Sequence, residues 1–202
     1  MKEQEKTSVA TLLQIDLQNL FYAARSKGHR IDFEKMWEHF HHREAEFLTD
    51  AVVYMIRSPD FDTSKFEAKL KSLGYTLRIK NTVKIQKGKR AIYKKSNHDL
   101  NMAVECIDRI NTFDKLILMS GDGDFSELCA YLKKKGKKIE IWSFKGCYNT
   151  DLDRYADKMY MIDDEFFLKK PDDDNLSFFS FNWGSPKELN IEKRKELGDK
   201  DA

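Results

Sequence analysis

Aspartates stand at the ends of two of the most apolar segments of this sequence. Asp16 closes the run 9–15, and Asp122 and Asp124 come directly after the run 115–119, within the motif SGDGDF. If the two runs are neighbouring strands of a parallel sheet, both segments reach the same carboxyl edge. Ligand sites of open α/β sheets form at that edge, near the point where the strand order reverses. The sequence therefore predicts a carboxylate site there.

Further polar residues are expected to join this site. Asp99 begins a predicted helix that leads into the run 115–119, and Glu105 lies on the same helix. The hydroxyl of Ser120 is suited to bind a carboxylate, a water or a phosphate oxygen. Taken singly, an aspartate after a strand is a common turn residue or helix cap, and Asp124 before Phe125 fits such a cap. The combination of acids favours function over this structural explanation.

A cluster of carboxylates implies a cation. Neighbouring negative charges raise one another's pKa unless a positive ion neutralises them. Oxygen ligands without cysteine or histidine favour Mg²⁺ or Mn²⁺. Such an ion activates a water and stabilises the leaving oxygen of a phosphodiester. The glycines of SGDGDF would let the backbone turn sharply beside a bulky polyanion.

Strands alternate with helices along the chain. Buried strands are predicted at 9–15, 51–56, 75–79, 115–119, 138–142 and 158–162 from short apolar runs. Helices are predicted at 19–24, 32–42, 64–73, 99–110, 125–135 and 149–156, with Asp32 as an N-cap and Gly74 as a stop. This order predicts an α/β fold with a mainly parallel sheet that is covered on both faces.

A β-hairpin is predicted at 82–93, immediately before Asp99. Its cations would neutralise phosphates and its tyrosine would stack on a base. The predicted nucleic-acid-binding residues are Lys84, Lys87, Lys89, Arg90, Tyr93, Lys94 and Lys95. A solvated hairpin with ordinary surface lysines is an equally good explanation of the pattern.

Composition indicates a folded protein without a membrane span. The chain has 202 residues, 41% of them hydrophobic, and its net charge of only +2 says little about partners. Three separated cysteines and the lack of a signal peptide predict reduced thiols and a cytoplasmic location. The expected organisation is an extension at 1–8, a domain at 9–168 and a tail at 169–202. The aromatic segment 176–183 would dock, and the end of the tail would fray.

The combined motifs resemble the NYN domain, in the LabA-like branch of the PIN-like nucleases. The resemblance rests on Asp16-x-x-Asn19, on the pair Asp99 and Glu105, and on the strand that enters SGDGDF. It continues through the stretches 128–138 and 152–161, and it covers about residues 9–165.

The resemblance implies a fold, an activity and a site. The fold would be a Rossmann-like three-layer α/β/α sandwich of the PIN-like kind, and the activity a Mg²⁺- or Mn²⁺-dependent ribonuclease. Single-stranded or structured RNA is then the expected partner, and a homodimer is compatible with the sequence. The implied metal-binding and catalytic residues are Asp16, Asp99, Asp122 and Asp124, with Asn19, Ser120 and Glu105 in support.

Two other functions compete with the nuclease. A phosphatase of the haloacid-dehalogenase kind resembles the pattern, but it needs a second aspartate two residues after Asp16, where this chain has Gln18. A non-catalytic RNA-binding or scaffold protein could keep the same fold. Unused clustered acids would be a stability liability, which argues against this second alternative.

Overall fold

The computed structural model describes residues 8–58, 62–87, 90–94 and 97–168, without the side chains of 83–87 and 90–94. The described elements all belong to a unit spanning Met1–Leu168. The tail predicted at 169–202, with its aromatic segment 176–183, lies outside the described residues, as does nearly all of the extension 1–8. The domain boundaries therefore remain predictions.

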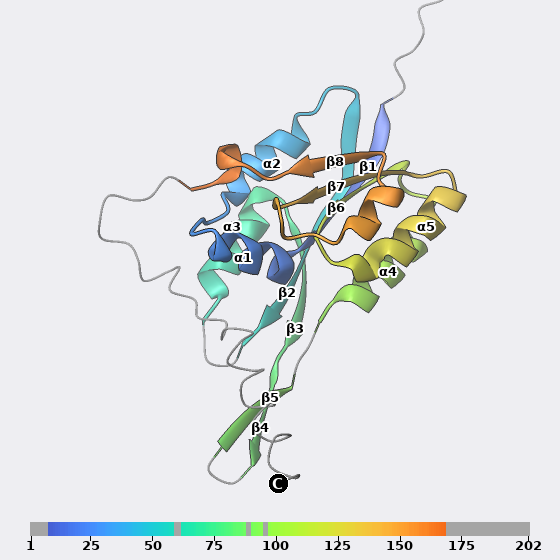
Figure 1. The fold of residues 1–202 in the computed structure, drawn as a ribbon. Coiled ribbons are helices and arrows are strands. Elements are labelled where there is room, and N and C mark those ends of the chain that lie inside the picture. Colours follow the sequence, from blue (N-terminus) through green and yellow to red (C-terminus); the bar gives the residue numbers. More distant parts are fainter. Residues whose placement is uncertain (1–7, 59–61, 88–89, 95–96, 169–202) are drawn as a thin grey trace, which may run out of the picture. The chain divides into compact units, whose positions relative to one another are not determined.

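A six-stranded sheet forms the centre of the fold (Figure 1). Its strand order is β3-β2-β1-β6-β7-β8, and every neighbouring pair is parallel. The strands are β1 (Val9–Asp16), β2 (Glu46–Arg57), β3 (Thr76–Asn81), β6 (Lys115–Met119), β7 (Lys138–Ser143) and β8 (Lys158–Met161). The predicted α/β class with a mainly parallel sheet is confirmed.

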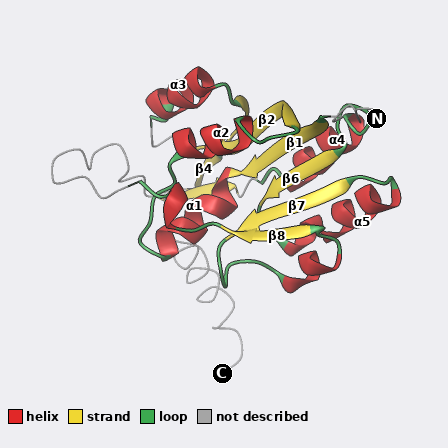
Figure 2. Ribbon diagram, turned by 90° about the horizontal axis from the view of Figure 1, so that it is seen from above, coloured by secondary structure: helices red, strands yellow, loops and turns green. Residues whose placement is uncertain are grey.

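Helices cover both faces of this sheet, as Figure 2 shows from above. One face carries α1 (Leu17–Ser26), α2 (Phe33–His41) and α3 (Ser64–Leu73), and the other carries α4 (Asp99–Asp108) and α5 (Ser126–Lys134). Successive side chains of β1 point to opposite faces of the sheet, because Leu13 packs in one hydrophobic cluster and Leu12 in the other. The three-layer sandwich is thus confirmed. In the described ranges, no helix is long and apolar enough to cross a membrane.

The strand order reverses between β1 and β6. From β1 the chain adds β2 and β3 on one side, then returns to add β6, β7 and β8 on the other. The two central strands end level with each other, because Ile15 pairs with Met119. This switch point is where open parallel sheets bind ligands.

Two predicted elements differ from the structure. Strand β2 begins at Glu46, five residues before the predicted run 51–56, because its first half pairs with β1 although it is not a continuous apolar run. The helix predicted at 149–156 is instead a 3₁₀ segment, Thr150–Arg154. Its N-cap Asn149 accepts a hydrogen bond from the N–H of Asp151. Apolar spacing over one or two turns does not distinguish these two helix types.

Strands β4 (Val83–Lys87) and β5 (Arg90–Lys94) pair antiparallel in a sheet of their own, between β3 and α4 in the chain. The side chains of Lys84, Lys87, Arg90, Tyr93 and Lys94 lie outside the described parts, as do residues Lys89 and Lys95 altogether. Their predicted role in binding nucleic acid therefore stays a prediction.

Candidate metal centre

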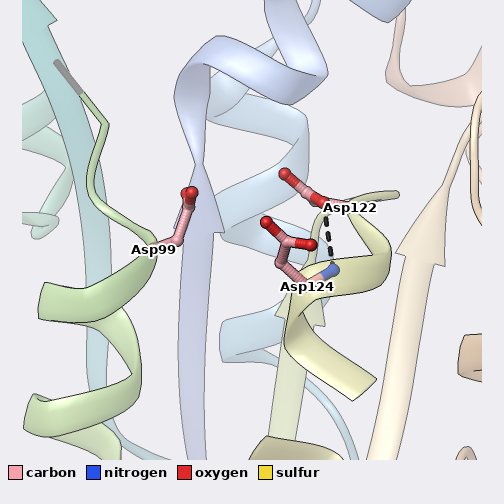
Figure 3. A group of neighbouring side chains, drawn as sticks. All are labelled: Asp99, Asp122 and Asp124. Atoms are coloured by element: carbon pink, nitrogen blue, oxygen red, sulfur yellow. Dashed lines mark hydrogen bonds between the residues drawn. The ribbon is translucent and has the colours of Figure 1, made fainter. Parts of the chain in front are cut away.

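Three carboxylates meet beside the ends of the central strands. One oxygen from each of Asp99, Asp122 and Asp124 lies within 4.8 Å of the others. Figure 3 shows Asp99 entering from the start of α4, and Asp122 and Asp124 entering from the SGDGDF loop. Oxygen ligands of one octahedral ion lie roughly 3–4 Å apart, given bonds of about 2.1 Å. Only small side-chain movements would bring this trio to that spacing.

Asp16, the fourth predicted acid, lies deeper and outside this trio. It is buried as the last residue of β1, and its side chain also caps α1 by accepting from the N–H of Asn19 at 3.1 Å. Burial raises the pKa of Asp16 to about 6, and the negative charges of Asp99 and Asp122 add to this rise. The ionised form of Asp16 is therefore destabilised by two of the three carboxylates, Asp99 and Asp122.

Two hydrogen bonds join the SGDGDF loop to the end of β1 and to the first turn of α1. The N–H of Gly121 donates to Asn19 Oδ1 at 2.8 Å, and Ser120 Oγ donates to Asp16 Oδ2 at 3.3 Å. The N–H of Asp122 in turn donates to Ser120 Oγ at 3.2 Å. Asn19 and Ser120 thus connect the two acidic segments, and their supporting role at the site stays a prediction.

The helix cap in this loop is Asp122, not Asp124. Asp122 Oδ1 accepts from the N–H of Asp124 at 3.1 Å and begins a 3₁₀ turn, Gly123–Phe125, that precedes α5. Asp124 itself is exposed and caps nothing. The structural explanation that the sequence offered for Asp124 is therefore wrong, because the cap lies two residues earlier, at Asp122. Asp122 keeps its second oxygen for a ligand.

Asp99 is positioned by contacts from the neighbouring strands. Lys80 of β3 donates to the backbone carbonyl of Asn97, whose side-chain amide donates to Asp99 Oδ2. The buried ring of His98 bonds through Nε2 to the carbonyl of Met55 at 2.9 Å. Since a carbonyl only accepts, Nε2 carries the proton. Sequence analysis did not select Asn97 or His98, because neither forms a motif with the acids.

Glu105, predicted to support the site, is engaged elsewhere. Arg78 donates to both of its oxygens, at 2.9 and 2.7 Å, and Tyr54 and Arg109 also contact the carboxylate. Burial would raise the pKa of Glu105, but hydrogen bonds from Arg78 and Tyr54 outweigh burial and lower it. Six residues separate Glu105 from Asp99, so the two lie on different sides of α4. Glu105 holds α4 to the sheet instead.

The donor set suits a hard divalent cation. All four acids offer oxygen, and no cysteine or histidine belongs to the trio. Mg²⁺ and Mn²⁺ prefer such ligands, usually together with several waters. Burial is the main cause of the raised pKa of Asp16, and the charges of Asp99 and Asp122 add to it; a bound cation would offset the contribution of these charges. Of the four predicted acids, Asp99, Asp122 and Asp124 are the ones whose oxygens lie close enough together that they could hold one ion.

The chain packs closely against both glycines of the loop. A Cβ at Gly121 would lie 2.2 Å from the carbonyl oxygen of Cys147 and 2.9 Å from Tyr148 Cα. A Cβ at Gly123 would meet the side chain of Asn149, with Nδ2 at 2.3 Å. Sequence analysis missed Asn149, although an Asn two residues before an Asp is a recognisable cap signal.

These contacts predict a graded effect of alanine. Gly121→Ala should slow any metal-dependent activity by about 10²-fold, because backbone must move and a 1 Å misplacement costs that much. Gly123→Ala should cost less, since the Asn149 side chain can rotate away. Metal titration and turnover of both variants would check this order. Equal activity of Gly121→Ala and the wild type would show that the loop tolerates displacement.

Comparisons with known proteins agree with this architecture. The sequence model of the NYN domain matches residues 10–163. A curated relative, the low amplitude and bright protein LabA of Synechococcus elongatus, is 29% identical over 149 residues, which cover 71% of this chain and 80% of the relative. A crystal structure of a protein of unknown function from Vibrio parahaemolyticus superposes with a TM-score of 0.69 at 24% identity. That match covers 82% of this chain and 99% of the other, and it supports the fold alone.

Proposed function

The chain belongs to the NYN domain family, and from this premise we propose that it is a divalent-metal-dependent ribonuclease with residues 9–168 as its catalytic domain. The family lies within the PIN-like nuclease superfamily, and the LabA relative is consistent with that placement. The observation that carries the proposal is the convergence of Asp99, Asp122 and Asp124 at the switch point of the sheet.

Each acidic residue of the site would have its own role in the reaction. Asp99, Asp122 and Asp124 would hold Mg²⁺ or Mn²⁺, and Asp16, with its pKa near 6, would be largely ionised at neutral pH. When bound, the ion would supply an activated water and would stabilise charge on the phosphodiester. Ser120 Oγ, which donates to Asp16 Oδ2, would keep that carboxylate oriented.

RNA is the proposed substrate because of the family and the basic segment next to the site. Strands β4 and β5 are inserted between β3 and the residues that lead into Asp99. Binding of a phosphate chain to the cations of this segment would bring RNA toward the start of α4. The identity of the ion and the class of substrate are both part of the proposal.

Cleavage of labelled single-stranded RNA by the purified protein tests this function. We expect cleavage with Mn²⁺ or Mg²⁺, none with EDTA, and a rate at least about 10²-fold lower for Asp122→Asn, because several kcal/mol of charge stabilisation are lost. Equal cleavage by the wild type and Asp122→Asn would contradict the proposal that this site is catalytic. Binding of RNA without cleavage under any divalent ion would support the scaffold alternative.

A further inference from the structure

The loop that follows β7 packs against the SGDGDF motif. The N–H of Asn149 donates to the carbonyl of Gly121 at 2.9 Å, and the backbone at Cys147 and Tyr148 fills the space beside Gly121. A turn closed by Cys147 N–H and Phe144 C=O at 2.9 Å shapes the loop from within. The loop 145–149 therefore contacts Gly121, the residue directly before Asp122.

Two side chains of this loop have no partner within the described part of the chain. Lys145 is exposed and makes no ion pair or hydrogen bond there, and Tyr148 is partly exposed and makes no side-chain hydrogen bond or ring contact. Other groups nearby in the sequence are engaged. Phe144 stacks on Phe167, and Arg154 pairs with Asp151 at 3.6 Å. The loop thus carries one cation and one aromatic ring that no other described side chain contacts through a hydrogen bond, ion pair or ring contact.

We propose that Lys145 and Tyr148 form a binding site for one nucleotide of single-stranded RNA beside the carboxylates, a proposal that rests on the proposed nuclease function. The Lys145 ammonium would contact a phosphate, and the Tyr148 ring would stack on the attached base. A phosphate chain that approaches four carboxylates meets repulsion, which a neighbouring cation reduces. An aromatic ring stacks on any base, so this site binds without strong sequence preference.

The same chemistry makes the site selective for unpaired nucleotides. The bases of a duplex already stack on one another, and a protein ring can reach a base face only when the strand is open. A loop held this firmly to SGDGDF would place the stacked base at a constant distance from Asp122. Lys145 and Tyr148 thereby favour cleavage in single-stranded segments over paired ones.

Fluorescence anisotropy with a labelled single-stranded RNA tests the site separately from cleavage. The full-length chain carrying Asp122→Asn serves as the background, so that the RNA stays intact. In this background Tyr148→Ala and Tyr148→Leu should each weaken binding about 10-fold, while Tyr148→Phe binds like the parent. Lys145→Met should reduce the salt dependence by about one phosphate contact.

Matched controls lie at the far end of β7. Tyr131 and Lys134 are exposed on α5, which precedes the start of that strand. Tyr131→Ala and Lys134→Met should leave binding unchanged. Binding of duplex RNA should not respond to any Tyr148 variant, and melting temperatures of all variants would confirm that they are folded.

The possible outcomes separate this inference from the nuclease proposal. If the wild type cleaves RNA and Tyr148→Ala binds as tightly as Tyr148→Phe, the nucleotide site is refuted while the nuclease proposal stands. If the wild type cleaves no RNA but binding still depends on the Tyr148 ring, the nucleotide site stands and the nuclease proposal fails.

Discussion

Replacing Asp99 with asparagine is expected to slow metal-dependent RNA cleavage by about 10²–10³-fold and to weaken Mn²⁺ binding. Asp99 is one of three carboxylates whose oxygens lie within 4.8 Å of one another, so its loss removes both a ligand and a negative charge. The magnitude corresponds to several kcal/mol of lost charge stabilisation at about 1.4 kcal/mol per tenfold. Initial rates and calorimetric Mn²⁺ titrations on the same preparations would measure both effects.

Glu105→Gln is the matched control on the same helix. Its carboxylate pairs with Arg78 at 2.7 Å and Arg109 at 3.4 Å, outside the acidic trio. Loss of its charge should lower the free energy of unfolding by about 1–3 kcal/mol and leave Mn²⁺ affinity nearly unchanged. If Glu105→Gln instead abolished metal binding and Asp99→Asn did not, the assignment of the two acids of α4 would be reversed.

Asp16→Asn is expected to stabilise the metal-free protein and to impair its activity. Burial, together with the charges of Asp99 and Asp122, raises the pKa of Asp16 from 3.8 to about 6. Such a shift corresponds to at most about 3 kcal/mol, and an uncharged amide that keeps the α1 cap should recover about 1–3 kcal/mol at pH 7.5. Chemical denaturation in EDTA would measure the gain. In this account the charge of Asp16 lowers the stability of the metal-free protein and is kept because the proposed function needs it.

The pH dependence of this gain has a defined sign. Because the folded-state pKa of Asp16 lies above its unfolded value, the contribution of this carboxyl to stability is full below pH 3.8 and is lost as pH rises through 6. The advantage of Asp16→Asn should therefore be complete above about pH 7 and vanish toward pH 4. Asp32→Asn, at the N-cap of α2, controls for the cap itself and should change stability little. A gain that does not depend on pH would contradict the electrostatic explanation.

The fold could be predicted from the sequence, and so could the meeting of Asp99, Asp122 and Asp124, whereas the position of Asp16 outside this group could not. Apolar runs such as 115–119 are buried on both faces, so they are recognisable without knowledge of their partners. The alternation of strands and helices then requires a parallel sheet, and Asp16 and Asp122 follow adjacent strands of it. The position of Asp99 was also predictable, because it begins the helix that leads back to the switch point.

The contacts that fix the acids could not be predicted from the sequence. His98 bonds to Met55, 43 residues away, and Asn149, in the segment that follows β7, packs on Gly123. Such pairs depend on the tertiary arrangement and leave no local pattern. The predicted role of Glu105 at the acidic site differs from its position in the structure. Spacing along a helix indicates which residues share a side of the helix, but it does not indicate which basic residues of other elements lie opposite them. Arg78 reaches Glu105 from β3, which lies elsewhere in the sequence.

The most direct test of the central claim is the anomalous diffraction of a crystal soaked in Mn²⁺. The carboxylate centre predicts an anomalous peak within coordination distance of Asp99, Asp122 and Asp124, with Asp16 beside it. The same soak of Asp122→Asn crystals should show a weaker peak or none. A crystal of the wild type with no peak between these aspartates at millimolar Mn²⁺, at a pH above 7, would contradict the claim that they form a metal centre.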